Sequence, residues 1–154
     1  MPLSRYDFSS LGLNSALVDN LSSLGYAEMT PIQAQALPSI LSNKDVIAKA
    51  KTGSGKTATF ALGLLNKLEV KRFRVQTLVL CPTRELADQV AVEIRKLARG
   101  IHNIKVLTLC GGMAFGPQVG SLEHGAHIVV GTPGRIEEHL RKANLNLDLS
   151  LIHI

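Results

Sequence analysis

Short apolar runs alternate with longer amphipathic segments over most of the chain. The apolar runs have the length of strands and carry few charges, which is typical of strands buried on both faces of a sheet. Their alternation with helices predicts an α/β protein with a parallel sheet, helices on both faces and right-handed crossovers. The predicted strands are DVIAKA (45–50), VQTLVLC (75–81), IKVLTLC (104–110) and HIVVG (127–131), and LSLIHI (149–154) resembles the start of another. The predicted helices span residues 55–70, 83–100, 116–125 and 133–143.

The first part of the chain has a different pattern. Residues 1–13 predict a loosely ordered lead-in, and residues 14–25 place apolar side chains at helical spacing before a glycine stop. A second helix over residues 29–41 starts with Thr30 as its N-cap and Pro31 at its first position. Pro38 lies inside that pattern and should kink or shorten the helix.

Composition limits the class of protein. The chain has 154 residues, of which 45% are hydrophobic and 19% charged, as in a globular domain. Its apolar runs are much shorter than the roughly 20 residues of a membrane span, and its first residues lack the apolar core of a secretion signal. We therefore expect a cytoplasmic protein with no membrane partner. Cys81 and Cys110 are expected to be buried free thiols, and the five scattered histidines do not predict a metal site.

The net charge of +5 leaves two interpretations open. It is either an ordinary solvated surface or the mark of a polyanionic partner such as nucleic acid. Two basic clusters fall at predicted helix ends, where cations also complement the helix dipole. They comprise Lys67, Lys71, Arg72 and Arg74, and then Arg95, Lys96 and Arg99.

The segment AKTGSGKT follows a predicted strand and opens a predicted helix, which is the setting of a phosphate-binding loop. Its glycines let backbone N–H groups converge on phosphate oxygens, and the helix N-terminus adds partial positive charge. Lys56 would reach the β- and γ-phosphates, and the Thr57 hydroxyl would hold Mg²⁺. The alternative is a glycine-rich turn with an accidental Gly-Lys-Thr. The candidate phosphate-binding residues are Ala50, Thr52, Gly53, Ser54, Gly55, Lys56 and Thr57.

Further motifs narrow the assignment. GYAEMTPIQ (25–33) stands before the loop, with a lone Phe8 upstream, and PTRELA (82–87), Gly111-Gly112 and TPGR (132–135) follow it. Their order and spacing resemble the DEAD-box family of ATP-dependent RNA helicases, which also has alanine where Ala50 stands. The resemblance extends from about Phe8 to Leu149. Residues 78–91 and 107–112 further resemble the branch of that family that acts on large-subunit ribosomal RNA.

The resemblance implies the roles of the residues in these motifs. Gln33 should hydrogen-bond the adenine edge and Tyr26 should stack on the adenine face, with Phe8 and Thr30 in the same region. The later motifs should contact the RNA backbone through charge-assisted bonds, hydroxyls and close backbone approach, largely without reading sequence. Alternatively, Thr-Arg-Glu and Thr-Pro-Gly-Arg only start helices. The expected RNA-contacting residues are Pro82, Thr83, Arg84, Gly111, Gly112, Thr132, Pro133, Gly134 and Arg135.

The family also implies a fold and a cofactor. Residues 14–154 should form part of a first RecA-like domain that binds ATP with Mg²⁺ and RNA, as a monomer. The family's Asp-Glu-Ala-Asp and Ser-Ala-Thr motifs and its second lobe do not occur in the sequence, so we expect an incomplete fold and no ATPase activity from this chain alone. The alternatives are a stand-alone ATP- or RNA-binding module, or another P-loop enzyme such as a small-molecule kinase.

Overall fold

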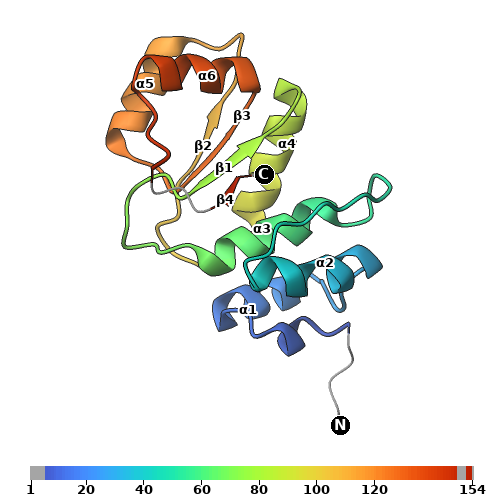
Figure 1. Cartoon of the computed structure of the whole chain (residues 1–154). Coiled ribbons are helices and arrows are strands. Elements are labelled where there is room, and N and C mark those ends of the chain that lie inside the picture. The colour runs from blue at the N-terminus through green and yellow to red at the C-terminus, as the bar shows by residue number, and fades with distance from the viewer. Residues whose placement is uncertain (1–5, 149–151, 154) are drawn as a thin grey trace. The chain divides into compact units, whose positions relative to one another are not determined.

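The computed structural model describes residues 6–148 and 152–153. The chain divides into two compact units, which are described separately below (Figure 1). The first unit comprises Met1–Lys67 and Lys96–His102, and the second comprises Leu68–Arg95 and Asn103–Ile154. No helix in the described part of the chain is long and apolar enough to cross a membrane.

The second unit is built on a parallel sheet. Its strands are β1 (Thr77–Leu80), β2 (Val106–Leu109), β3 (Ile128–Gly131) and β4 (Ile152–His153), in the order β2-β3-β1-β4. Leu80 and Leu109 both pair with Gly131, so β1, β2 and β3 end at the same level. The parallel α/β sheet and three of its strands are as the sequence predicts. Of the expected strand over residues 149–154, only β4 lies within the described residues.

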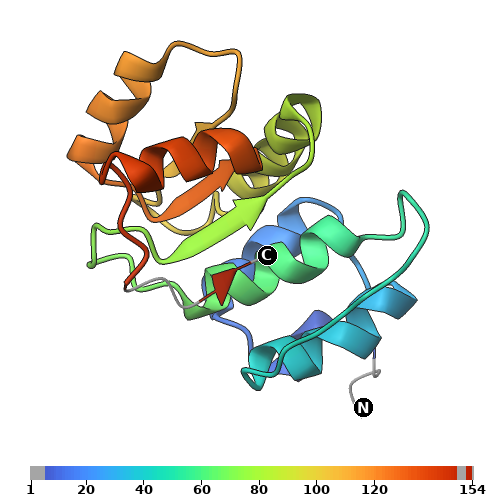
Figure 2. The ribbon, with the colours of Figure 1, turned by 45° about the horizontal axis from the view of Figure 1, so that its top comes forward.

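Three helices cover this sheet. They are α4 (Arg84–Leu97), α5 (Phe115–His124) and α6 (Pro133–Arg141). The crossover from β1 to β2 runs in one direction across the sheet, and the crossovers from β2 to β3 and from β3 to β4 run in the opposite direction. Right-handed crossovers therefore place α5 and α6 on one face and α4 on the other (Figure 2). Helices on both faces explain why the strands are almost continuously apolar.

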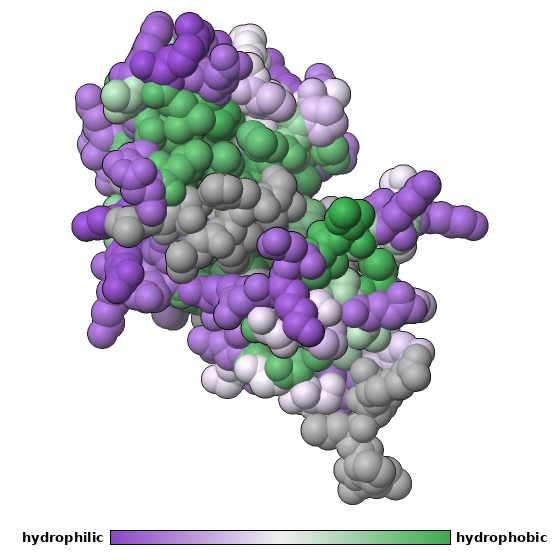
Figure 3. All heavy atoms as spheres, in the orientation of Figure 1, coloured by the Kyte–Doolittle hydropathy of each residue, from purple (hydrophilic) through white to green (hydrophobic). Residues whose placement is uncertain are grey.

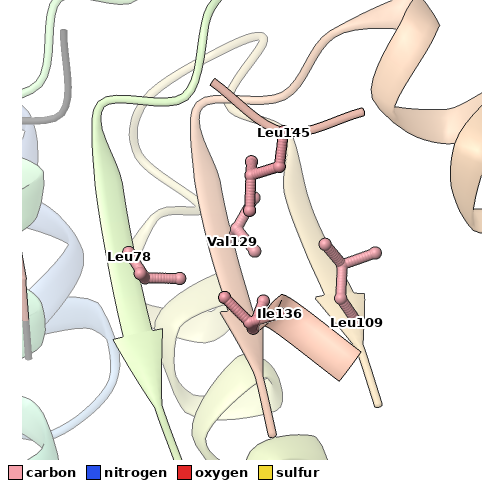
Figure 4. Close-up of a cluster of buried hydrophobic side chains, with 5 residues drawn as sticks. All are labelled: Leu78, Leu109, Val129, Ile136 and Leu145. Atoms are coloured by element: carbon pink, nitrogen blue, oxygen red, sulfur yellow. The ribbon is translucent and has the colours of Figure 1, made fainter. Parts of the chain in front are cut away.

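The core of the second unit lies between the sheet and α6. Leu78, Val129 and Leu109 come from three strands and share one face, where Ile136 of α6 and Leu145 pack on them (Figure 4). Figure 3 shows apolar side chains gathered over this part of the unit, below α5 and α6. This core fixes the carboxyl ends of the strands, where the later motifs lie.

The first unit is helical. It contains a 3-10 helix η1 (Phe8–Leu11) and the helices α1 (Ser15–Ser23), α2 (Pro31–Leu41) and α3 (Lys56–Lys67). Helices α2 and α3 approach so closely that a Cβ on Gly63 would lie 2.3 Å from the Ile40 side chain. Thr30 is the N-cap residue of α2, as predicted.

One sequence expectation in this unit is wrong, namely the strand before the phosphate loop. Residues 45–50 form no strand, and the Ile47 side chain is fully exposed. An apolar run becomes a strand only where it pairs with the N–H and C=O groups of a neighbouring strand, and residues 45–50 pair with none of the described strands. Helix α2 continues to Leu41, three residues beyond Pro38. Within the described part of the lead-in, residues Phe8–Leu11 form η1 and Phe8 is only 3% exposed.

Candidate functional site

The candidate phosphate loop runs from Ala50 into the start of α3. Gly53 and Gly55 have φ angles of +79° and +91°, in the left-handed region that favours glycine. The first amide groups of α3 have no partner within the helix and are available to an anion. The Lys56 ammonium group donates to the carbonyl oxygen of Ala50, so the loop is closed by its own lysine. The loop therefore has two features that a phosphate-binding loop requires, left-handed glycines and a helix start directly after them.

The carbonyl oxygen of Gly55 joins this loop to α2. It accepts hydrogen bonds from the backbone N–H of Thr59 at 3.1 Å, from the Thr59 hydroxyl at 2.8 Å and from the Gln33 amide at 3.2 Å. The other end of the Gln33 amide accepts from the backbone N–H of Thr30 at 2.9 Å. A Cβ on Gly55 would lie 2.5 Å from the Gln33 amide nitrogen, so only glycine fits. Gln33 thus positions the loop.

The same contacts bear on the expected adenine contact of Gln33. Its side chain is 1% exposed, and both ends of its amide are bonded within the protein. Each end retains capacity for one further hydrogen bond. Because the amide is buried, contact with an adenine edge requires the surrounding segment to move. The adenine role of Gln33 stays a prediction.

Two buried hydroxyls at the loop test whether a nucleotide fits. Among the described residues, the side-chain oxygens of Thr30 and Ser54 are the buried side-chain polar atoms that find no hydrogen-bond partner. Buried polar groups are nearly always paired, so such atoms point to a missing partner. Together with the partnerless amides of α3, they fit an anion with several acceptor oxygens. The residues of the loop therefore fit the phosphates of ATP.

The other predicted nucleotide residues line a separate hollow in the first unit. Phe8, Gly25 and Tyr26 border a cavity of about 320 Å³ between η1 and α1. The ammonium nitrogen of Lys96 lies 5.7 Å from the centre of the Tyr26 ring. Gln33 does not line this cavity. The structure thus places Phe8 and Tyr26 together, and Gln33 with the phosphate loop.

The later motifs meet at one edge of the second unit. PTRELA follows β1, Gly111-Gly112 follows β2 and TPGR follows β3, and these are neighbouring strands. Ligands of α/β sheets bind outside the carboxyl ends of the strands. The Thr132 hydroxyl accepts a hydrogen bond from the backbone N–H of Gly111 at 3.1 Å, which ties two of the motifs together. Gly112 has a φ of +78°.

The PTRELA segment presents one free cation. Thr83 accepts from the backbone N–H of Leu86 at 3.2 Å, so its hydroxyl starts helix α4, as one interpretation of the sequence holds. Arg84 is exposed beside a cavity of about 290 Å³ that Thr108 and Cys110 also line. The Arg84 side chain makes no hydrogen bond or ion pair within the described residues. Its guanidinium is therefore free to meet an anion.

Arg135 differs from Arg84 because it is held from several sides. Its guanidinium donates to the Met113 carbonyl at 2.8 Å and to the Gln118 side-chain oxygen at 3.0 Å. It also lies 3.3 Å from a Glu138 carboxylate oxygen. These partners come from the segment after β2, from α5 and from α6. Arg135 thus braces the edge, and only part of its donor capacity remains for RNA.

Gln118 is the centre of this bracing. Its amide nitrogen donates to the Cys110 carbonyl at 3.2 Å, and its oxygen also accepts from His139 at 2.8 Å. The His139 ring is fully buried and stacks on Phe115 with ring centres 4.4 Å apart. Because the Gln118 oxygen only accepts, His139 must carry its proton on Nε2.

The environment of His139 keeps it neutral. Burial lowers the pKa of His139 below its usual value, and the nearby Arg135 guanidinium lowers it further. Glu138 acts in the opposite direction and Lys142 adds to the lowering. A neutral imidazole donates one hydrogen bond to Gln118 without adding a third cation to the cluster.

Sequence reasoning missed Gln118, His139 and Thr59. Gln118 lies in a segment whose pattern predicts only a helix between two strands. His139 stands three residues after the buried Ile136, and this spacing places both on one face of α6. Thr59 follows Gly55 at the spacing of one helical turn. Helical spacing was therefore the sequence feature that could have pointed to His139 and Thr59.

The remaining sequence predictions concern cysteines and histidines. Cys81 and Cys110 are free and buried, as predicted, and burial raises the pKa of both thiols. Within residues 6–148 and 152–153, no group of three or more possible metal-binding side chains occurs. His124 ends helix α5, which agrees with the helix predicted over residues 116–125, and His127 accepts from the Lys105 amide at 3.0 Å.

Comparison with known proteins identifies the family of the chain. The family model for the DEAD/DEAH box helicase matches residues 30–152. The chain is 59% identical over 142 residues to the ATP-dependent RNA helicase DbpA of Escherichia coli, covering 92% of this chain and 31% of that protein. It is 48% identical over 140 residues to DeaD of Buchnera aphidicola, covering 91% of this chain and 23% of that protein. The chain thus spans about a third or less of the length of these relatives.

Solved structures agree. A crystal structure of a DEAD box protein from Methanococcus jannaschii matches with a TM-score of 0.88 and 39% identity, covering 94% of this chain and 39% of that one. Saccharomyces cerevisiae Dbp5, bound to RNA and ADP BeF3, matches with a TM-score of 0.84 and 27% identity, covering 96% of this chain and 36% of that one. These matches confirm the RecA-like fold class predicted from the sequence. The chain belongs to the DEAD/DEAH box helicase family.

Proposed function

We propose that this chain forms the ATP-binding and RNA-backbone-binding part of an ATP-dependent RNA helicase. The observation that carries the proposal is the edge of the second unit, where three motifs follow three neighbouring parallel strands. Backbone amides, the starts of α4 and α6 and the exposed Arg84 guanidinium form a row suited to successive phosphates. Such contacts follow charge and backbone shape, so binding is largely independent of RNA sequence.

The first unit supplies the nucleotide site in this proposal. Lys56 turns from the Ala50 carbonyl to the phosphates, and the amides of α3 and the Ser54 hydroxyl complete the cradle. Thr57 holds Mg²⁺, which neutralises phosphate charge when bound. Phe8, Tyr26, Thr30 and Gln33 hold the adenine. This assignment rests on the loop geometry and on the two buried hydroxyls without partners.

The chain alone is proposed to bind ATP without hydrolysing it. Hydrolysis in P-loop proteins needs one carboxylate for Mg²⁺ and a further group to orient water. The sequence has no Asp-Glu-Ala-Asp segment to supply them. For the longer protein we propose RNA unwinding in the cytoplasm. The proposed substrate is ribosomal RNA. The resemblance of residues 78–91 and 107–112 supports that choice.

Nucleotide binding is tested by titrating the chain with a fluorescent ADP analogue in the presence of Mg²⁺. Lys56→Ala should weaken binding by about tenfold or more, because a charge-assisted contact to phosphate is lost. Lys51→Ala, at an exposed position of the same loop, should change the affinity little. Equal affinity for both variants would contradict the nucleotide site. Phosphate release that depends on Lys56 would contradict the absence of hydrolysis.

RNA binding is tested by fluorescence anisotropy with a short labelled single strand. Arg84→Ala should weaken binding severalfold and reduce the slope of log affinity against log salt by about one. Arg141→Ala removes the same charge at the C-terminal end of α6 and is the matched control for net charge. The edge assignment fails if both variants lose affinity equally or if neither does.

A further inference from the structure

The turn over residues 69–76 is a preorganised loop that the family motifs do not include. It lies between α3 and β1, and its shape is fixed from inside by the buried Gln76. The Gln76 amide donates to the carbonyl oxygens of Glu69 and Arg72 at 2.9 and 2.7 Å and accepts from the Glu69 N–H at 2.9 Å. The backbone N–H of Gln76 also donates to the His127 carbonyl at 2.8 Å. The loop is therefore held in one conformation.

This loop displays an exposed aromatic ring. Phe73 is 50% exposed and is the one aromatic among the large exposed hydrophobic side chains of the described residues. Exposed aromatic rings are unusual, because a buried Phe contributes a large apolar area to folding. An explanation for the exposure of Phe73 therefore has to come from outside the core.

The exposed ring is fixed in place. It meets His127 edge-on with ring centres 4.7 Å apart, and a Cβ on Gly125 would lie 2.6 Å from its Cδ1. His127 is itself held between the Lys105 amide at 3.0 Å and the Val70 carbonyl at 2.9 Å. A ring held in this way loses little conformational entropy when a ligand stacks on its open part.

Cations surround the ring. Lys71, Arg72 and Arg74 flank it in sequence and are exposed. The one carboxylate of the loop, Glu69, is paired with Arg72 at 2.8 Å. Neither Lys71 nor Arg74 has a side-chain hydrogen bond or ion pair within the described part of the chain. The loop thus carries three cations, one carboxylate and one fixed ring.

We propose that the loop of residues 69–76 is a second RNA contact, in which a base of single-stranded RNA stacks on Phe73 while Lys71 and Arg74 bind the flanking phosphates. Single-strand binding surfaces combine stacked aromatics with cations that follow the backbone. An acidic peptide would use the cations but would have no use for the ring. The ring therefore favours RNA.

The position of the loop makes it a separate site. It precedes β1, whereas the phosphate-binding motifs follow the carboxyl ends of the strands. Strands of four residues rise about 13 Å, so the loop and the motif edge lie at opposite ends of the sheet. RNA at the loop is thus additional to RNA at the edge, and the inference does not depend on the proposed function.

The chain offers a direct optical test, because it contains no tryptophan. Phe73→Trp creates a single fluorophore at the proposed stacking position, and Val92→Trp creates one on the exposed face of α4. Titration with a short single-stranded oligoadenylate RNA should quench Phe73→Trp in a saturable manner and leave Val92→Trp nearly unchanged. Equal quenching of both variants, or none of Phe73→Trp, would overturn the proposal.

The ligand controls separate stacking from charge. An abasic strand with the same backbone, and polyglutamate, should each fail to quench Phe73→Trp. Quenching by either of them as strong as by the oligoadenylate would show that no base stacks there. Circular dichroism of both variants checks that the fold is kept.

Affinity measurements provide a second readout. Phe73→Ala should weaken single-strand binding by about fivefold or more, as expected for the loss of one stacked base, whereas Val92→Ala should not. Replacing Lys71 and Arg74 by Gln should lower the salt slope by about two. Quenching of Phe73→Trp should persist in an Arg84→Ala background, which distinguishes failure of this site from failure of the motif edge. If Arg84→Ala abolishes the quenching, the loop is not an independent site.

Discussion

The phosphate loop of the first unit and the motif edge of the second unit carry equally recognisable motifs, yet they are supported differently. At the edge, each motif follows a paired strand, and strand register brings the three to one level. The phosphate loop follows residues 45–50, which belong to no strand, and its lysine is bonded to its own backbone. The edge is therefore positioned by a sheet, and the loop only by Gln33 and the start of α3.

A binding motif and the secondary structure that holds it in place are therefore separate requirements. Preorganised groups bind with less loss of entropy than groups that must first be ordered. We therefore expect the isolated chain to bind RNA phosphates closer to full strength than it binds nucleotide.

Gly131→Ala should destabilise the second unit most. A Cβ at Gly131 would lie 2.4 Å from the Leu109 carbonyl oxygen and 2.7 Å from Ile136, so strands β2 and β3 would have to separate. We expect a loss of about 3 kcal/mol in the free energy of unfolding. Gly116→Ala in α5, where a Cβ meets nothing within 4 Å, should be neutral or slightly stabilising. Urea denaturation of both variants provides the measurement, and similar midpoints would refute the close approach.

Gln118→Ala should remove the bracing of the edge. It leaves Arg135, His139 and the Cys110 carbonyl each without one partner, which should cost about 2 kcal/mol of stability. RNA affinity should fall as well, because the Arg135 guanidinium loses one of the three contacts that orient it. Gln89→Ala, exposed on α4, is the matched control. An RNA affinity unchanged in Gln118→Ala would mean that the bracing is purely structural.

Gln33→Ala should act on the other region and less strongly. The Gly55 carbonyl keeps its two bonds from Thr59, so we expect a loss of about 1 kcal/mol in stability. Preference for adenine over guanine nucleotides should also fall, whereas Gln35→Ala on the exposed side of α2 should leave it intact. A retained preference would contradict the proposed adenine contact of Gln33. Competition of ADP and GDP against the fluorescent analogue measures this.

Acidification should weaken the second unit through His139. Its pKa is lowered in the folded state from the ordinary value of 6.5, so the unfolded chain binds more protons below that pH. The stabilising contribution is complete above about pH 6.5 and is lost as the pH falls through the lowered pKa of the folded state. Thermal melts should show a melting temperature that declines from neutral to mildly acidic pH. His139→Gln should reduce this decline, whereas His102→Gln, at an exposed position, should not. Identical declines would exclude His139 as the cause.

Ile47→Thr should have the smallest effect on stability. Its side chain is fully exposed in the unpaired segment, so the change should stay within about 0.5 kcal/mol. Solubility should improve, because an exposed apolar run promotes association. Val129→Thr, in the paired strand β3, should instead be strongly destabilising. Light scattering and denaturation of both variants compare the two regions, and a large loss for Ile47→Thr would mean that residues 45–50 are paired in solution.

The sequence by itself determined the fold class, most helices and the motifs. Alternation of apolar runs with amphipathic segments is a local pattern, and it correctly located β1, β2, β3 and helices such as α3, α4 and α6. The order of the motifs was sufficient to indicate the family. Buried thiols at Cys81 and Cys110 also followed from their place at the ends of apolar runs.

Only the tertiary structure decided which apolar runs pair and which side chains brace the site. Residues 45–50 have the composition of a strand, but pairing depends on a free neighbouring edge, which no local pattern encodes. The contacts from Gln118 to Arg135 and His139 join residues that are 17 and 21 positions apart. Side chains so distant in sequence meet only when strand register and crossover handedness have placed α5 and α6 together, and for that reason these residues became visible only in the folded chain.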